Sequence, residues 1–586
     1  MSGSPVPMAR QGLWTYTLPL EALENQALLQ AILALGSLHI SFLQQAPPTV
    51  SLKHYHYALR SVSVAVGLPM RRKHISTLAA TLLLGYYEVM GADHCKWHSH
   101  VAGSAQLVRE IDFAGITRSL RAQRRRDWAQ RQQREPSTLS PAESLCLADM
   151  DSEDDPFAES ELNINENLIG ALVGRAVNYD ELGQIEDGRA DARHESHFTR
   201  EYIENFRIQC DLYWQYLQQD VIQGILSGGP LFMPYSQWGL CPPRAGMGRL
   251  DAIYGSADHL WLLLGRLTDF GVRDRKRKLT ATQSTGSKWR PDFRFASFMA
   301  RFTKRDPEQQ TRPPIGGAVQ PPSGSPSTAP PFYGMAQPRR PRYPPPDFVE
   351  FADDSKYDEE SPEETRYDEA EAEWESILTA FDAFGSALGP HFMPLPADSV
   401  SPIPTPFGPA LQYRTHTIAV LWSYYFAGRI LLHRLHPSMP PAMMVSAKDT
   451  RKISGERIAA GIYDSQIVRQ EAGALSPALG SCLIKMTVPI FCAAIQCTDP
   501  AQRANCCENA WRVAAKQGRG PPHERKDTAD YEQASKWTPP GKESSLSDTG
   551  ERRFVTVARC AAAAGWAMGL LSSEDDVLNL KLEDRL

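Results

Sequence analysis

The sequence has no excess of basic residues, and this absence limits how it could contact nucleic acid. Its 586 residues contain 62 Lys and Arg against 68 Asp and Glu, which gives a formal net charge of −6. A chain with this balance has no overall attraction to phosphate backbones, so contact with DNA requires a local basic patch or a separate module.

Features typical of secreted or membrane-spanning chains are also missing. The N-terminus has no apolar core of signal-peptide length, and there is no Asn-x-Ser/Thr glycosylation acceptor. The longest apolar run, residues 477–497, carries Lys485 near its middle, which favours a buried helix over a membrane span. The ten cysteines follow no disulfide framework. We therefore expect a soluble, intracellular chain with no membrane partner.

Recognisable catalytic motifs are absent as well. The sequence contains no Gly-x-Ser-x-Gly elbow, phosphate loop, dinucleotide glycine fingerprint or His-Glu-x-x-His. His194 and His197 lie three positions apart in a polar stretch, one fewer than the metalloprotease spacing, and are interpreted as surface residues. No enzymatic activity is predicted, although an active site assembled from distant residues would leave no motif.

What the sequence does contain is helical periodicity. Between Leu28 and Phe113 the apolar residues recur at steps of three, four and seven, which predicts four consecutive helices in antiparallel pairs. Asp93 is expected to cap the fourth helix. No run of residues alternates as a strand would. The predicted fold class is all-α, a multi-helix antiparallel helical domain with long disordered insertions.

Changes in composition along the chain predict its organisation. We expect an N-terminal tail (1–24), a first helical part (25–272, with a loop at about 135–162), a mostly disordered Pro-rich and acidic insertion (273–369), a second helical part (370–573, with a loop at about 517–550) and a C-terminal tail (574–586). Within the second part, the helix expected over 413–435 is apolar almost all round and is therefore predicted to be central.

Several helical segments together resemble a known family. They are LLQAILALGSLHIS from Leu28, LKHYHYALR from Leu52, LAATLLLGYYEVM from Leu78 and WHSHVAGSAQLV from Trp97. In this order they are similar to the fungal-specific transcription factor domain. Residues 164–188, 241–266 and 552–569 resemble relatives of the same group. The resemblance implies a helical regulatory region, a location in the nucleus, and partners among the transcription machinery or co-regulators. It also leaves room for a small-molecule effector and a homodimer.

The chain departs from that family in one respect. The family's zinc binuclear cluster uses six cysteines beginning with Cys-x2-Cys, and no such pair occurs here. Cys506 and Cys507 are adjacent, which a tetrahedral site rarely uses. We therefore expect no cofactor in this chain, with zinc only if a cluster lies upstream. DNA would be contacted only through a module absent from this sequence.

One short helix concentrates residues that bind metals elsewhere. His94, Cys95, His98 and His100 lie within seven positions, and His94 and His98 share a helical face. Four ligands in one short helix cannot all converge on one ion, so we expect a polar helix start with Trp97 buried instead of a metal site.

Two basic clusters are candidate nuclear import signals. The first is Arg124, Arg125 and Arg126, and the second is Arg275, Lys276, Arg277 and Lys278. Such runs can bind import receptors or phosphate, and they also occur as solvated helix ends.

An acidic stretch with interspersed aromatic residues, 348–374, fits either an activation segment or a plain linker. The sequence as a whole therefore favours a fungal transcription regulator, seen as its helical regulatory region. The alternative is an α-helical ligand-binding or interaction scaffold, or an enzyme without a motif, that does not bind DNA directly.

Overall fold

The computed structural model describes most of the helical parts of the chain. It covers residues 12–44, 46–91, 94–134, 164–180, 198–284, 363–396 and 404–439, with shorter pieces at 294, 297, 398–399, 401, 482, 485–490 and 492–493. The statements below concern these residues.

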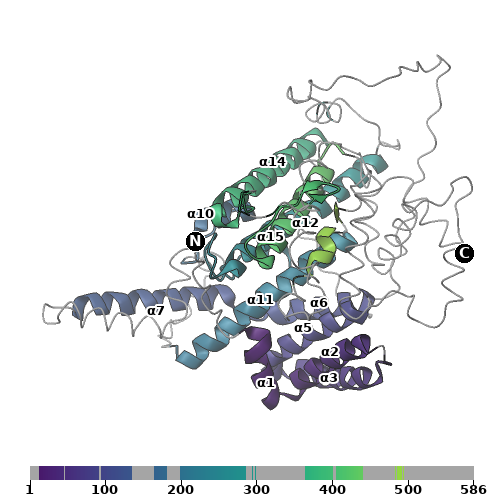
Figure 1. The fold of residues 1–586 in the computed structure, drawn as a ribbon. Coiled ribbons are helices and arrows are strands. Elements are labelled where there is room, and N and C mark those ends of the chain that lie inside the picture. The colour runs from purple at the N-terminus through teal and green to yellow at the C-terminus, as the bar shows by residue number, and fades with distance from the viewer. Residues whose placement is uncertain are drawn as a thin grey trace, which may run out of the picture.

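The N-terminal part is a stack of helices that occupies the lower half of Figure 1. Its elements are η1 (Leu13–Thr17), α1 (Leu18–Glu24), α2 (Gln26–Leu43), α3 (Thr49–Gly67), α4 (Pro69–Arg72), α5 (Ile75–Gly91), α6 (His94–Arg109) and α7 (Phe113–Arg134). Helices α2 and α3 pack as a hairpin, in which the Ser51 hydroxyl donates to the Ala34 carbonyl at 3.1 Å. Helix α5 is buried along most of its length and forms the centre of this part.

The remaining helices form the upper half of the molecule. They are α10 (Glu166–Val173), α11 (Arg200–Ser227), α12 (Ile253–Ser284), α14 (Glu363–Ala387) and α15 (His416–Arg434), with short 3-10 turns at Tyr235–Gln237 (η2) and Pro390–Phe392 (η4). A two-residue hairpin, β1 (Pro404–Thr405) with β2 (Gly408–Pro409), is the only strand pair among the residues covered. Helix α11 packs against both α5 and α6 of the lower half and α12 of the upper half.

Polar side chains mark where several of these helices begin. Asn25, Asn165, Thr199 and Thr415 each accept a backbone N–H of the first turn of α2, α10, α11 and α15. Such bonds satisfy donors that have no partner within the helix. The boundaries therefore follow from local chemistry.

One continuous apolar core runs through both halves, from Leu18 of α1 to Ala493. Helix α15 is buried on nearly every side, which confirms its predicted central position. The all-α class is likewise confirmed. No helix that the structure describes is long and apolar enough to cross a membrane.

The structure differs from the expected boundaries in three places. Helix α12 continues to Ser284, beyond the expected end of the first helical part at residue 272, and α14 begins at Glu363 inside the expected insertion. The added turns of α12 are polar, and an ion pair such as Arg273 to Glu373 of α14, at 2.6 Å, holds them instead of apolar periodicity. The expected N-terminal tail contains η1 and α1, which bury Leu18 and Ala22 but are too short to show a period.

Other predictions lie outside the residues that the structure describes. These are the loops at about 135–162 and 517–550, most of the insertion, most of the second helical part beyond Met439 and the C-terminal tail. The Asp93 cap lies there too.

Gly265 of α12 lies close to a loop residue. A Cβ at this position would lie 2.3 Å from the Trp238 ring, which is 1% exposed. Glycine is therefore required at this contact, whereas Gly36 in α2 has no neighbouring atom within 4 Å of where a Cβ would be.

These two helical glycines give a matched prediction. Gly265→Ala forces the Trp238 ring to shift and should lower the free energy of unfolding by about 1–3 kcal/mol. Gly36→Ala should raise it by about 0.5–1 kcal/mol, because alanine costs less backbone entropy in a helix. Urea unfolding followed by circular dichroism measures both; equal effects would show that the Trp238 contact is not tight.

Candidate functional site

The first predicted import cluster lies on α7, which Figure 1 shows projecting from the body of the molecule. The helix is anchored at its start by Phe113 and Leu120, both buried. Arg125 forms an ion pair with Asp180, and Arg121 donates to Glu166 at 2.7 Å. Arg125 and Arg126 are nevertheless exposed, and Arg124 is half-buried. This cluster therefore presents charge to solvent.

The second predicted import cluster lies near the end of α12 in a different environment. The Lys278 side chain is 9% exposed; its Nζ lies 2.5 Å from Asp274 and donates to the His436 carbonyl at 2.9 Å. Burial lowers the pKa of Lys278. Arg277 donates to Asp274 at 2.7 Å and to the Pro437 carbonyl at 3.3 Å. These two side chains bind the turn that follows α15. Positive charge at this place is favourable, because the C-terminal end of a helix carries partial negative charge.

The histidine side chains near the start of α6 contact different neighbours and do not converge. The His98 ring packs edge-on against Phe232 at 4.5 Å, whereas the His100 Nε2 lies 3.2 Å from the Tyr55 hydroxyl. Burial lowers the pKa of His100 to about 4. The side chains of His94 and Cys95 are outside those described, and so are His194 and His197. Among the side chains that are described, no three His, Cys, Asp or Glu are placed to hold a metal.

Sequence reasoning missed an ion cluster centred on Arg244, in which the Asp258 side chain is 1% exposed and those of Arg244 and Asp211 are 25% and 26% exposed. Its guanidinium donates to both oxygens of Asp258 in α12, at 2.7 and 2.9 Å, and to Asp211 in α11 at 2.7 Å. The Arg244 backbone N–H also donates to Asp258, at 3.0 Å. Burial raises the pKa of Asp258, and the adjacent guanidinium opposes that shift. The three residues lie far apart in sequence, so no local pattern could reveal the cluster.

A second missed network surrounds Asp220 of α11. Its carboxylate accepts from the Tyr216 hydroxyl at 2.7 Å and from the backbone N–H groups of Phe232 and Met233 at 2.9 and 3.2 Å. Burial raises the pKa of Asp220, while these bonds oppose the shift. The network fixes the loop after α11 and is closed to solvent, so its role is structural.

An open groove lies between the N-terminal helices and α11. It has a volume of about 580 Å³, within the range of ligand sites. Its lining combines carboxylates with apolar side chains: Leu13, Tyr16, Thr17, Leu20, Glu21, Glu24, Glu204, Arg207, Ile208 and Asp211. The groove and the Arg244 cluster share Asp211, so the cluster also supports one wall of the groove.

The Arg244 cluster gives a prediction with a control in the same loop. Arg244→Met leaves two carboxylates without their cation and should lower the free energy of unfolding by about 3–5 kcal/mol. Arg249→Met breaks a pair with Asp251, whose side chain is 43% exposed, and should cost about 1 kcal/mol or less. Thermal unfolding of the two variants measures the difference; similar losses would mean that the Arg244 cluster contributes no more than a surface pair.

Comparison with known proteins gives one match. Residues 2–150, about a quarter of the chain, match a family described as "Fungal specific transcription factor domain". Searches of curated proteins and of solved structures found no match. The matched range contains α1 to α7, which include the segments that carried the resemblance in the sequence. It supports a fungal transcription regulator in general, and residues 2–150 are similar to this domain family.

Proposed function

We propose that this chain is the helical regulatory region of a fungal transcription regulator and acts by binding other proteins of the transcription apparatus. The family match over residues 2–150 is the observation that carries this proposal. Under this proposal the chain has no catalytic role, and DNA is contacted through a zinc-cluster module that is separate from this chain.

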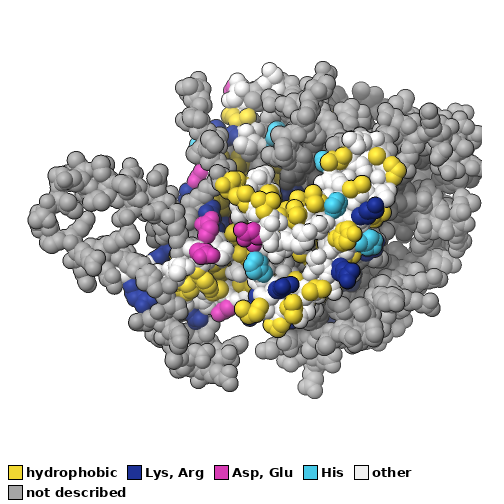
Figure 2. All heavy atoms as spheres, turned by 90° about the horizontal axis from the view of Figure 1, so that it is seen from below, with side chains coloured by type: hydrophobic (Ala, Val, Ile, Leu, Met, Phe, Trp, Pro, Cys, Tyr) yellow, Lys and Arg dark blue, Asp and Glu magenta, His cyan; other side chains and the backbone are white. Residues whose placement is uncertain are grey.

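The matched segment supports this role because it carries exposed apolar side chains. On the α2–α3 hairpin, Leu33 is 40% exposed, Ile40 54%, Val50 59% and Tyr57 62%. Figure 2 views the molecule from this side and shows apolar side chains spread over the face. Exposed apolar surface of this kind marks sites of protein association. We call the outward face formed by these four residues the hairpin surface.

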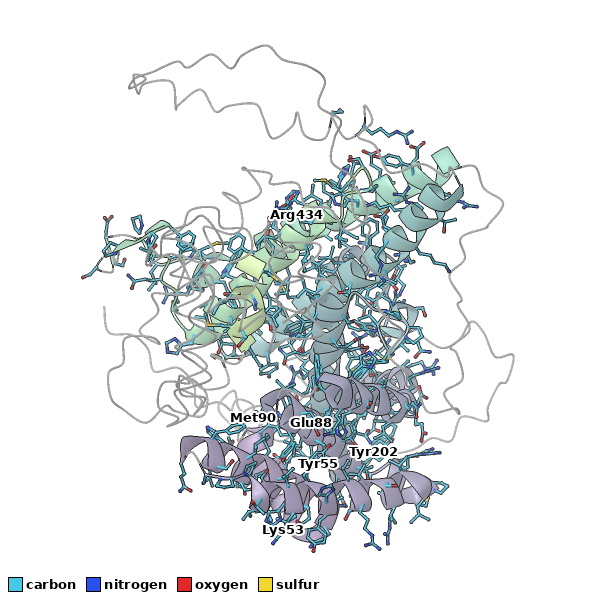
Figure 3. The ribbon with its side chains drawn as sticks, turned by 90° about the vertical axis from the view of Figure 1, so that its right-hand side faces the viewer. Lys53, Tyr55, Glu88, Met90, Tyr202 and Arg434 are labelled. Carbon is cyan, nitrogen blue, oxygen red and sulfur yellow. The ribbon has the colours of Figure 1, made fainter. Side chains whose placement is uncertain are left out.

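The hairpin surface has a firm support. Tyr55 of α3 stacks on Tyr87 of α5 with ring centroids 4.4 Å apart, and the Tyr87 and Ser51 hydroxyl oxygens lie 3.0 Å apart. Figure 3 shows Tyr55 between the helices and Lys53 at the outer edge. A rigid support lowers the entropy cost of binding a partner.

The proposal places the protein in the nucleus, with import through the first basic cluster. Arg125 and Arg126 are exposed at the surface, although Arg125 pairs with Asp180, whereas Arg277 and Lys278 of the second cluster are mostly buried against Asp274 and carbonyl groups. An import receptor can bind only basic side chains that are accessible at the surface.

A reporter assay tests the regulatory role. The full chain is fused to an unrelated DNA-binding module, and transcription of a reporter gene is measured in a fungal cell. Leu33→Glu with Val50→Glu places charge on the hairpin surface and should lower the regulatory effect at least about fivefold, since each change removes apolar contact area. Met70→Glu, an 87% exposed apolar residue of α4, is the control.

No effect of the unmodified fusion on transcription would contradict the regulatory role. Equal loss in the hairpin and Met70 variants would contradict the assignment to the hairpin surface.

Import is tested separately by imaging a fluorescent fusion of the full chain. Replacing Arg124, Arg125 and Arg126 together by alanine should reduce the nuclear to cytoplasmic ratio by about half or more, because receptor contacts depend on these charges. Arg275→Ala with Lys276→Ala should leave it unchanged. Arg277 and Lys278 are kept, since their loss would disturb the fold. The reverse result would assign import to the second cluster.

A further inference from the structure

The stretch from α2 into α5 carries charged residues of one sign only. Residues 26–87 contain five Lys and Arg residues and no Asp or Glu, although the whole chain has a net charge of −6. Arg72 pairs with Glu110 of α6 at 3.0 Å. Lys53 and Arg60 of α3 are exposed, and no carboxylate among the residues that the structure describes pairs with either of them. These two cations are therefore accessible to a negatively charged partner.

Lys53 and Arg60 alternate with exposed apolar residues along one side of α3. Val50 is 59% exposed, Tyr57 62% and Val64 53%. Steps of three and four residues return to the same side of a helix, so these five residues form one row, which we call the α3 stripe. It shares Val50 and Tyr57 with the hairpin surface. Figure 2 shows basic and apolar side chains next to one another on this face, and Figure 3 shows Lys53 at its outer edge.

The dimensions of the α3 stripe define what could cover it. At about 1.5 Å per residue, Val50 and Val64 lie roughly 21 Å apart along the helix, and Lys53 and Arg60 roughly 10 Å apart. A partner helix of about four turns has this length. With carboxylates two turns apart and apolar residues between them, such a helix would match the stripe in both charge and apolar contact.

Nucleic acid and membrane surfaces match the α3 stripe less well. A phosphate backbone is bound by several cations together, whereas here apolar side chains separate the two cations. A helix lying on a membrane places its apolar residues on one face and its cations on the opposite face. In α3 both kinds of residue share one face, and the other side packs on α2 and α5.

We propose that the hairpin surface and the α3 stripe together bind an acidic, amphipathic helix of a partner protein. Carboxylates of that helix pair with Lys53 and Arg60, and its apolar side chains cover Val50, Tyr57 and Val64. Exposed ion pairs contribute little free energy each, so the apolar contacts supply most of the affinity and the cations select an acidic partner. This inference rests on the proposed function for the role of the hairpin surface, and it adds the chemistry of the partner.

A synthetic helical peptide tests the inference against the full chain. The peptide has about fourteen residues, with leucines on one face and glutamates seven positions apart, and its binding is followed by fluorescence anisotropy. It should bind the unmodified chain, and the affinity should fall as salt is raised, because salt screens exposed charge pairs. Lys53→Glu with Arg60→Glu should weaken binding about tenfold or more. A peptide with lysine in place of each glutamate should show the reverse preference, binding this variant better than the unmodified chain.

The matched control is Lys276→Glu with Arg414→Glu. It makes the same charge change at exposed positions outside the N-terminal helices. It should leave the affinity for the acidic peptide unchanged, and circular dichroism should show that both variants are folded.

An acidic peptide that does not bind the full chain, or that binds the Lys53 and Arg60 variant equally well, would overturn the proposal. An equal loss of affinity in the control variant would also overturn it. Binding of duplex DNA or of phosphatidylserine vesicles through Lys53 and Arg60, without binding of the peptide, would assign the surface to that ligand instead.

The failure of this inference can be distinguished from the failure of the proposed function. A fusion that changes reporter transcription, in a chain that does not bind the peptide, would overturn the acidic partner and keep the regulatory role. Peptide binding by a chain whose fusion leaves transcription unchanged would support the acidic partner and contradict the regulatory role.

Discussion

The Arg244 guanidinium lies between carboxylates from two helices, and the placement of α12 against α11 depends on it. Asp211 belongs to α11, which packs on the N-terminal helices, and Asp258 belongs to α12, which packs on α14 and α15. A buried ionic group is tolerated only when each charge has a partner in good geometry, so the cluster admits few relative positions of the two helices. It thereby fixes α12 against α11 and, through Asp211, one wall of the groove.

The loop between α11 and α12 is held by interactions of the same kind. Asp220 receives the backbone N–H groups of Phe232 and Met233, and the Met233 carbonyl accepts from the Trp238 indole at 3.0 Å. The Trp238 ring then fills the space left by Gly265. The buried Asp220 carboxylate therefore positions the loop, and the loop in turn positions the Trp238 ring against α12. These contacts fix the conformation of this long loop as firmly as hydrogen bonds fix the helices beside it.

The sequence could predict the features of this fold that repeat along a helix. Apolar spacing located α2, α3, α5, α6 and α15, because each buries one face or its whole surface. It missed the outer turns of α12, where Arg273 pairs with Glu373 of α14, since ion pairs have no period. It also missed the Arg244 cluster, whose members meet only in the folded chain. In the basic run ending at Lys278 the sequence suggests more exposure than the structure shows. Four consecutive cations predict an exposed patch, but Arg277 and Lys278 are buried because they pair with Asp274 one turn earlier.

The burial of Lys278 has a consequence for the chemistry of its amine. Lys276 is exposed, whereas the Lys278 amine lies against Asp274 and the His436 carbonyl. An acylating reagent or an acetyltransferase can therefore reach Lys276 in the intact fold, but it reaches Lys278 only when the ends of α12 and α15 separate. Acylation would then remove the charge that holds the turn and keep the two ends apart. The relative labelling of two lysines in one short peptide thus reports how often this corner of the protein opens.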